Sequence, residues 1–130
     1  SQLVAAAHAP DREKLHALLQ QRVQQLQASM ARAEQLAAFN RLGPAELHKA
    51  RLALITAQLA ATTDASERAD LHTKRIAIHE RGCRSVEAAF RTGRATQMAV
   101  LDAKLNVLQA KIDMENDATG KPVPGKTGDR

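Results

Sequence analysis

The chain of 130 residues has the length of one domain, and its 44% hydrophobic and 25% charged residues are enough to form a core, which excludes a compositionally disordered protein. Aromatic residues make up only 2%, with six Gly and four Pro, which argues against a β-sandwich or barrel. No apolar run is long enough to span a bilayer, and the one Cys cannot form an internal disulfide. The net charge of +5 would permit attraction to phosphates or anionic lipid. Because Lys and Arg alternate with Asp and Glu along every segment, the pattern nevertheless argues against a nucleic-acid binder.

Residues 1–10 are expected to form a flexible N-terminal segment. They lack a complete targeting signal, and Leu3 to Ala9 fit either the end of an apolar signal or a frayed helix end, so export stays an open alternative. The first helix is expected to begin after Pro10, where Asp11 and Glu13 place negative charge in the opening turn. Its apolar residues recur near the coiled-coil period over about thirty residues. They are Leu15, Leu19, Leu26, Met30, Ala33 and Leu36, with Leu18, Val23 and Ala37 widening the stripe.

Gly43 and Pro44 predict a short turn and the start of a second helix, over about 44–61. Gly43 is expected to take the positive φ of a helix end, and Pro44 suits the first position of the next helix. One apolar seam and a second apolar row follow. The seam holds Leu47, Ala50, Leu54, Ala57 and Ala61, and the second row holds Leu52, Ile55 and Leu59.

A second break at 62–67 separates the two halves, and Asp64 with Glu67 predicts a capping box there. The third helix is expected to run to about Phe90 or Thr92. Its seam is predicted to hold Ile76, His79, Cys83, Val86 and Phe90.

Gly93 predicts the turn into a fourth helix, with Thr92 or Thr96 as the N-cap. This helix is expected to end near Asp117, with residues 118–130 as a disordered basic tail. Its seam is predicted from steps of three and four, with a row alongside that repeats by seven. The seam is Met98, Leu101, Leu105, Leu108 and Ile112, and the row is Val100, Val107 and Met114.

The two halves of the chain resemble each other. Residues 50–59 align with residues 103–112, and the pair Phe39 and Gly43 is matched with Phe90 and Gly93, with a small length difference in the turn. Each repeat, about 11–63 and 64–117, is therefore expected to be a helical hairpin. Two such hairpins predict an all-α fold class: two antiparallel helical hairpins forming an elongated four-helix bundle over residues 11–117.

Residues 90–105 resemble the repeat of TolC-type outer-membrane efflux proteins, in which an aromatic residue, a Gly, a small-residue turn and a Val-Leu-x-Ala helix recur twice. The resemblance extends over about residues 15–113. The chain lacks the length and the alternating strands of the family's β-barrel. The resemblance thus implies a stand-alone helical-hairpin module of a bacterial cell envelope, and it carries over no catalytic or transport residue.

His72, His79 and Cys83 lie at offsets of seven and four on the third helix, so all three point to one face. Imidazole and thiolate at this spacing are ligand types for Zn, Cu, Ni or Co. The same positions also fit an apolar seam, in which a free Cys acts as a small hydrophobe and a His fills a partly buried slot. Both interpretations stay open, the second being favoured.

Sequence motifs of enzymes are lacking: there is no phosphate-binding Gly loop, no Ser elbow and no His-Glu-x-x-His. Asp113 and Glu115 are interpreted as solvated charges. The favoured hypothesis is a non-enzymatic structural or interaction module without a cofactor, whose apolar helix face binds a second copy of itself or another coiled-coil protein. The alternatives are a periplasmic metal-binding or metal-sensing protein that uses His72, His79 and Cys83, and a binder of nucleic acid or an anionic membrane surface.

Overall fold

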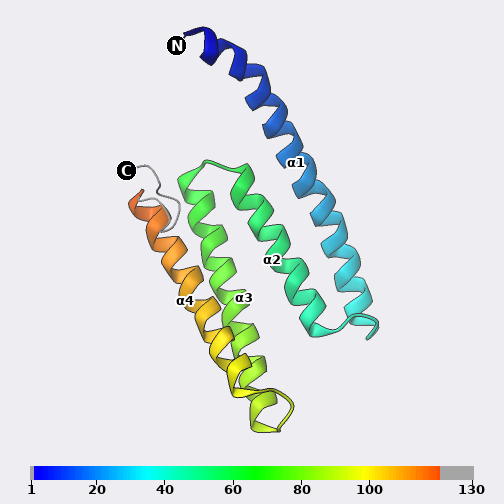
Figure 1. Ribbon diagram of the computed structural model, residues 1–130. Helices are drawn as coiled ribbons and strands as arrows, with labels where there is room; N and C mark the ends of the chain where they lie inside the picture. The colour runs from blue at the N-terminus through cyan, green and yellow to red at the C-terminus, as the bar shows by residue number, and fades with distance from the viewer. Residues whose placement is uncertain (1, 121–130) are drawn as a thin grey trace. The chain divides into compact units, whose positions relative to one another are not determined.

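The computed structural model describes the backbone of residues 2–120 and the side chains of residues 11–120. This part of the chain forms four helices and no strand, which confirms the all-α fold class. The helices are α1 (Gln2–Ala38), α2 (Pro44–Ala61), α3 (Ala65–Arg91) and α4 (Gln97–Thr119) (Figure 1). The chain divides between Thr63 and Asp64 into two compact units, in which α1 contacts α2 and α3 contacts α4.

Helix α1 begins at Gln2 and not after Pro10, so the predicted start is wrong, and residues 2–10 of the expected flexible segment are helical. The alanines at positions 5, 6, 7 and 9 have the highest helix propensity of any residue and favour the helix up to the proline. Pro10 has no N–H to donate to the Ala6 carbonyl, so one backbone hydrogen bond is missing within the helix.

Helices α1 and α2 pack through the predicted apolar stripe, and Val23, which was expected only to widen it, belongs to the buried cluster. Val23, Ala57 and Ala61 are buried together, and three half-buried leucines pack against them: Leu19, Leu26 and Leu54. Met30 and Ala33 continue the buried row along α1. The spacing of these residues alternates between three and four, as in a coiled-coil seam.

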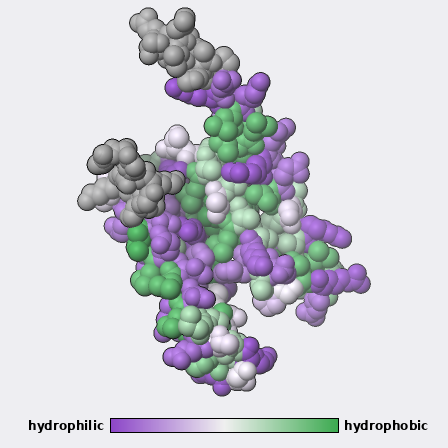
Figure 2. All heavy atoms as spheres, in the orientation of Figure 1, coloured by the Kyte–Doolittle hydropathy of each residue, from purple (hydrophilic) through white to green (hydrophobic). Residues whose placement is uncertain are grey.

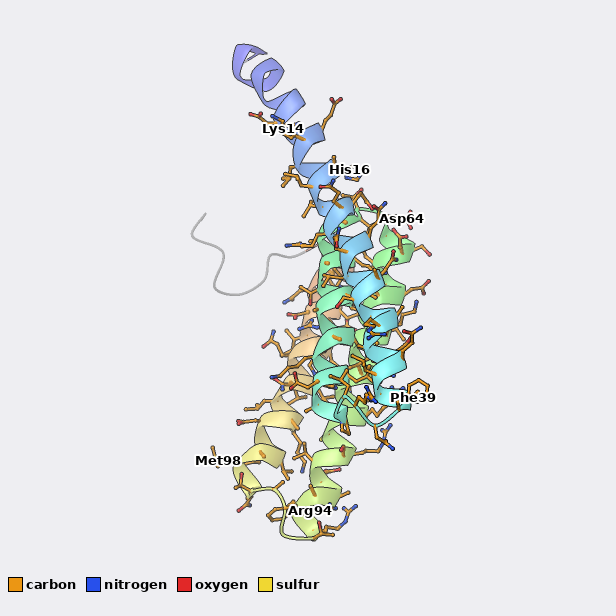
Figure 3. The ribbon with its side chains drawn as sticks, turned by 90° about the vertical axis from the view of Figure 1, so that its right-hand side faces the viewer. Lys14, His16, Phe39, Asp64, Arg94 and Met98 are labelled. Carbon is orange, nitrogen blue, oxygen red and sulfur yellow. The ribbon has the colours of Figure 1, made fainter. Side chains whose placement is uncertain are left out.

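Helix α1 is longer than its partner. The side chain of Gln20 donates a hydrogen bond from Nε2 to the carbonyl oxygen of Ala61 at 3.3 Å, which marks where α2 ends along α1. Residues 11–18 extend past this point, in the stretch where Figure 3 labels Lys14 and His16. Leu15 and Leu18, predicted to join the stripe, are each 56% exposed because α2 does not reach them.

The two connections within the units have the same length and the same hydrogen bonds. Each first helix ends in a Schellman cap, in which two successive N–H groups reach back over a residue of positive φ. That residue is Asn40 (φ 58°) after α1 and Gly93 (φ 77°) after α3. The cap bonds are Asn40 N to Ala37 O, Arg41 N to Leu36 O, Gly93 N to Phe90 O and Arg94 N to Ala89 O.

Gly43 does not take the positive φ that the sequence predicts. Its backbone is extended (φ −77°, ψ 162°), and it is the N-cap of α2, followed by Pro44 in the first turn as expected. The second connection has Thr96 at the corresponding N-cap, and Gly93 corresponds to Asn40, each 53 positions later. The pairing of Gly43 with Gly93, and of Phe39 with Phe90, is therefore wrong by a few residues.

Substituting serine for each glycine should have opposite effects on stability. We expect Gly43→Ser to raise the free energy of unfolding by a few tenths of a kcal/mol, because the serine fits the extended backbone and forms a capping box with Glu46. Gly93→Ser should lower it by about 1 kcal/mol, because a β-carbon is strained at positive φ. Urea unfolding followed by circular dichroism measures both effects. A Gly43→Ser variant less stable than the wild type would contradict the assignment of Gly43 as the N-cap of α2.

The second unit begins and ends with well-formed caps. Asp64 accepts a hydrogen bond from the Glu67 N–H at 2.8 Å, which confirms the N-cap predicted there. Thr96 accepts one from the Ala99 N–H at 3.0 Å, so Thr96 is the N-cap of α4, and the alternative, Thr92, is the C-cap of α3. Helix α4 continues to Thr119, two residues beyond its predicted end, and Gly120 closes it with a φ of 71°. Residues 118 and 119 of the predicted tail are thus helical, and residues 121–130 lie outside the described residues.

Candidate functional site

The apolar row predicted to be the seam of α4 is exposed. We name it the outer stripe. Its members are Met98 (64% exposed), Leu101 (45%), Leu105 (61%), Leu108 (54%) and Ile112 (46%). In Figure 2 hydrophobic spheres follow the left edge, where Figure 1 draws α4, and Met98 points away from the helix pair in Figure 3. The prediction that this row forms the packed seam of the fourth helix is therefore wrong.

Helix α4 instead contacts α3 through the row predicted to lie beside the seam, which we name the inner face. The inner face consists of Val100, Ala103, Val107, Ala110 and Met114, all buried or half-buried. At about 100° per residue it lies on the opposite side of the helix from the outer stripe. Its small residues Ala103 and Ala110 permit a close approach to α3, and Ala110 is fully buried.

The inner face could have been found from the repeat. Adding the same 53 positions to the α2 seam, Leu47 to Ala61, gives Val100 to Met114, the whole inner face. The larger leucines of the outer stripe mask this signal, because large apolar side chains are usually buried.

A polar cluster closes one end of the α3–α4 seam. Asp117 Oδ2 accepts a hydrogen bond from Arg68 Nε at 2.8 Å and lies 3.0 Å from His72 Nε2. His72 is only 5% exposed, and its Nδ1 is buried without a hydrogen-bond partner among the described residues. The hydrogen bond from Arg68 lowers the pKa of Asp117 and outweighs the raising effect of burial.

Asp113 forms a second bridge within the same seam. Its carboxylate accepts hydrogen bonds from the Arg75 guanidinium at 2.7 Å and from Gln109 Nε2 at 2.8 Å. Burial raises the pKa of Asp113, but these two hydrogen bonds and the charge of Arg75 more than offset it, so the pKa lies below its usual value. The interpretation of Asp113 as a solvated charge is wrong. Sequence reasoning missed this cluster because its partners are far apart in the chain.

Acid should destabilise the α3–α4 pair through these two carboxylates. Because both pKa values are lower in the folded state than in the unfolded chain, their contribution is complete above about pH 4 and is lost as the pH falls further. We expect the melting temperature of the wild type to fall more steeply below pH 4 than that of an Asp113→Asn/Asp117→Asn variant. The variant should be less stable than the wild type at pH 7. If the melting temperatures of the two proteins fall equally below pH 4, the two carboxylates do not stabilise the α3–α4 pair.

The three candidate metal ligands are spread along α3. His72 packs beside Asp117, whereas His79 and Cys83 lie two and three turns further on, half-buried. With a rise of about 1.5 Å per residue, His72 is roughly 10 Å from His79 along the axis, too far for one metal ion. Among the described residues no group of three or more His, Cys, Asp or Glu could hold a metal. The pair His79 and Cys83 stays a prediction.

Cys83 lies in a shallow depression between α3 and α4, beside the outer stripe. The depression is lined by Glu80, Cys83, Arg84, Lys104, Val107 and Leu108. Lys111 Nζ lies 3.9 Å from Glu80 Oε2 nearby, a long and exposed ion pair. The stripe thus adjoins a depression that is lined by both apolar and charged side chains.

No protein-family model matches the chain, and neither the curated proteins nor the solved structures include a significant match to it. Within residues 2–120, no helix combines the length and the hydropathy needed to cross a membrane.

Proposed function

We propose that this protein is a non-enzymatic helical interaction module whose outer stripe on α4 binds a second apolar helix. The observation that carries the proposal is the exposure of all five members of the stripe, which are between 45% and 64% exposed. Monomeric proteins rarely leave a continuous apolar row of this kind in water, and such rows mark interaction sites. The stripe also has the three-four spacing that coiled-coil seams need.

We also propose how the four helices are arranged. Each repeat is an antiparallel hairpin, and the two hairpins form an elongated four-helix bundle. Two features support this. Arg68, Arg75 and Glu80 of α3 pair with successively earlier residues of α4, as antiparallel helices require. The second feature is the apolar row of Leu52, Ile55 and Leu59 on α2, which is buried or half-buried in addition to the seam.

The placement in a bacterial cell envelope rests on the similarity of residues 90–105 to the TolC-type repeat. The repeat of two hairpins with identical connections agrees with such a module. No residue of this chain is assigned a catalytic or transport role.

The strength of the contact follows from the stripe's size. Burying a large apolar side chain completely contributes about 1.5–3 kcal/mol, and the members of the stripe have roughly half of that still to gain. Summed over five side chains from each partner, this remaining free energy of burial is comparable with the association cost of about 4–15 kcal/mol. The association of the stripe should therefore be weak and reversible.

Sedimentation velocity of the full chain over about a hundredfold range of concentration tests the proposal. We expect the mean mass to rise with concentration and to be insensitive to added salt, because apolar contacts are not screened. A chain that stays monomeric throughout the range, or an association that salt dissolves, would contradict it.

A further inference from the structure

The partner that best fits the outer stripe is the outer stripe of a second copy. Its apolar row covers two heptads without a polar interruption, so it needs a partner row of similar length. Outside the stripe, the large apolar side chains that are exposed among residues 11–120 are Leu15, Leu18, Phe39 and Phe90. None of these forms a row of three at helical spacing, so a second stripe is the matching surface.

The polar residues that flank the stripe select an orientation. With Leu105 at a heptad a position and Leu108 at d, the e and g positions follow from the sequence. The e positions are Asp102, Gln109 and Asn116, and the g positions are Gln97, Lys104 and Lys111.

A parallel pair places each g residue against the e residue five positions later in the other copy. Gln97 then faces Asp102, and Lys104 faces Gln109, so the flanking e and g positions bring no like charges together. Glu115 is the next d position after Leu108, so the parallel pair ends at Ile112. An antiparallel pair places g against g, so that Lys104 faces Lys104 or Lys111 of the other copy. Like charges in these positions oppose association, which favours the parallel pair.

We propose that two copies of the chain associate through their outer stripes as a parallel, in-register α4–α4 pair with two-fold symmetry. This proposal rests on the proposed function and adds to it the identity and the orientation of the partner. Met98 then lies beside Met98 of the other copy, and Ile112 beside Ile112. The turns that hold Gly93 lie at the same end of the dimer in both copies.

Disulfide trapping of the full-length chain tests this orientation. Cys83 is first replaced by serine, and Met98→Cys and Ile112→Cys are introduced separately into that background. In a glutathione redox buffer each variant alone should form a covalent dimer at least about tenfold more abundant than that of an Asn106→Cys control, because only facing positions satisfy disulfide geometry. Asn106 is exposed on α4 outside the stripe. Circular dichroism confirms that each variant keeps its helix content.

Mixing the two variants distinguishes the outcomes, because intact mass separates the homodimers from the mixed dimer. Two homodimers without a mixed dimer support the parallel pair. A mixed dimer between Met98→Cys and Ile112→Cys chains overturns it in favour of an antiparallel pair and leaves the proposed function standing. Association in sedimentation without any trapped dimer overturns the α4–α4 contact. A wild type that stays monomeric at all concentrations overturns both the inference and the self-association on which it rests.

Discussion

Replacing Leu105 by lysine should weaken association at least about a hundredfold while leaving the helix content of the chain unchanged. The side chain is 61% exposed, so the monomer loses little packing, and lysine has nearly the helix propensity of leucine. In a symmetric dimer each substitution acts twice: two apolar contacts are lost and two charges enter an apolar seam. We expect a loss of about 3 kcal/mol or more in association free energy, since 1.4 kcal/mol corresponds to a factor of ten.

The matched control for this experiment is Asn106→Lys, one residue away on the same helix. It adds a positive charge at an exposed position outside the outer stripe, so association should change by less than about threefold. Sedimentation equilibrium gives both association constants, and circular dichroism gives the helix content. If both variants associate as the wild type does, the outer stripe is not the contact and the proposed function fails.

Enlarging the alanines of the two seams should produce the largest losses of stability. Ala110 is fully buried and Ala57 is 2% exposed, and the two are equivalent positions of the two units. Ala110→Leu and Ala57→Leu each add three carbons where the helices approach closely, which we expect to lower the free energy of unfolding by about 1–3 kcal/mol.

Ala53→Leu is the control for these variants, because Ala53 is exposed on the same helix as Ala57. Its effect should stay within about 0.5 kcal/mol. Urea unfolding at neutral pH measures all three. An Ala110→Leu variant as stable as Ala53→Leu would mean that Ala110 does not lie at a close helix contact.

The helices themselves were predictable from sequence because their ends carry local signals. Asp64 and Thr96 act as N-caps through bonds to residues three positions ahead, which the sequence shows directly. Pro44 likewise begins α2. The start of α1 was predicted wrongly because proline is typical of the first turn of a helix. In the structure the alanines before Pro10 are already helical. Gly43 was given the conformation that Asn40 adopts, since glycine is the more common residue at positive φ.

The choice of face on α4 was less predictable because both faces are apolar. Periodicity identifies a row, but it does not say which of two rows a neighbour covers. The outcome depends on residues of α3: Arg68 and Arg75 reach Asp117 and Asp113 only when the inner face is turned towards them. These contacts join residues 49 and 38 positions apart in the sequence, so a local pattern does not contain them. The five residues of the outer stripe were thus recognised as an apolar row, but the side of α4 that packs against α3 was not predicted correctly.

Residues 11–18 of α1, which extend beyond the end of α2, should be less stable than the paired part of the first unit. Residues 11–18 have no α2 residue opposite them, so their amide protons are protected by the hydrogen bonds of a lone helix, and lone helices of this length are marginal in water. Unwinding can begin at this end and stop near Gln20 without disturbing the seam around Val23. Hydrogen exchange should therefore be fast up to that point and slow beyond it, and a protease that removes this end of α1 would leave the paired helices folded.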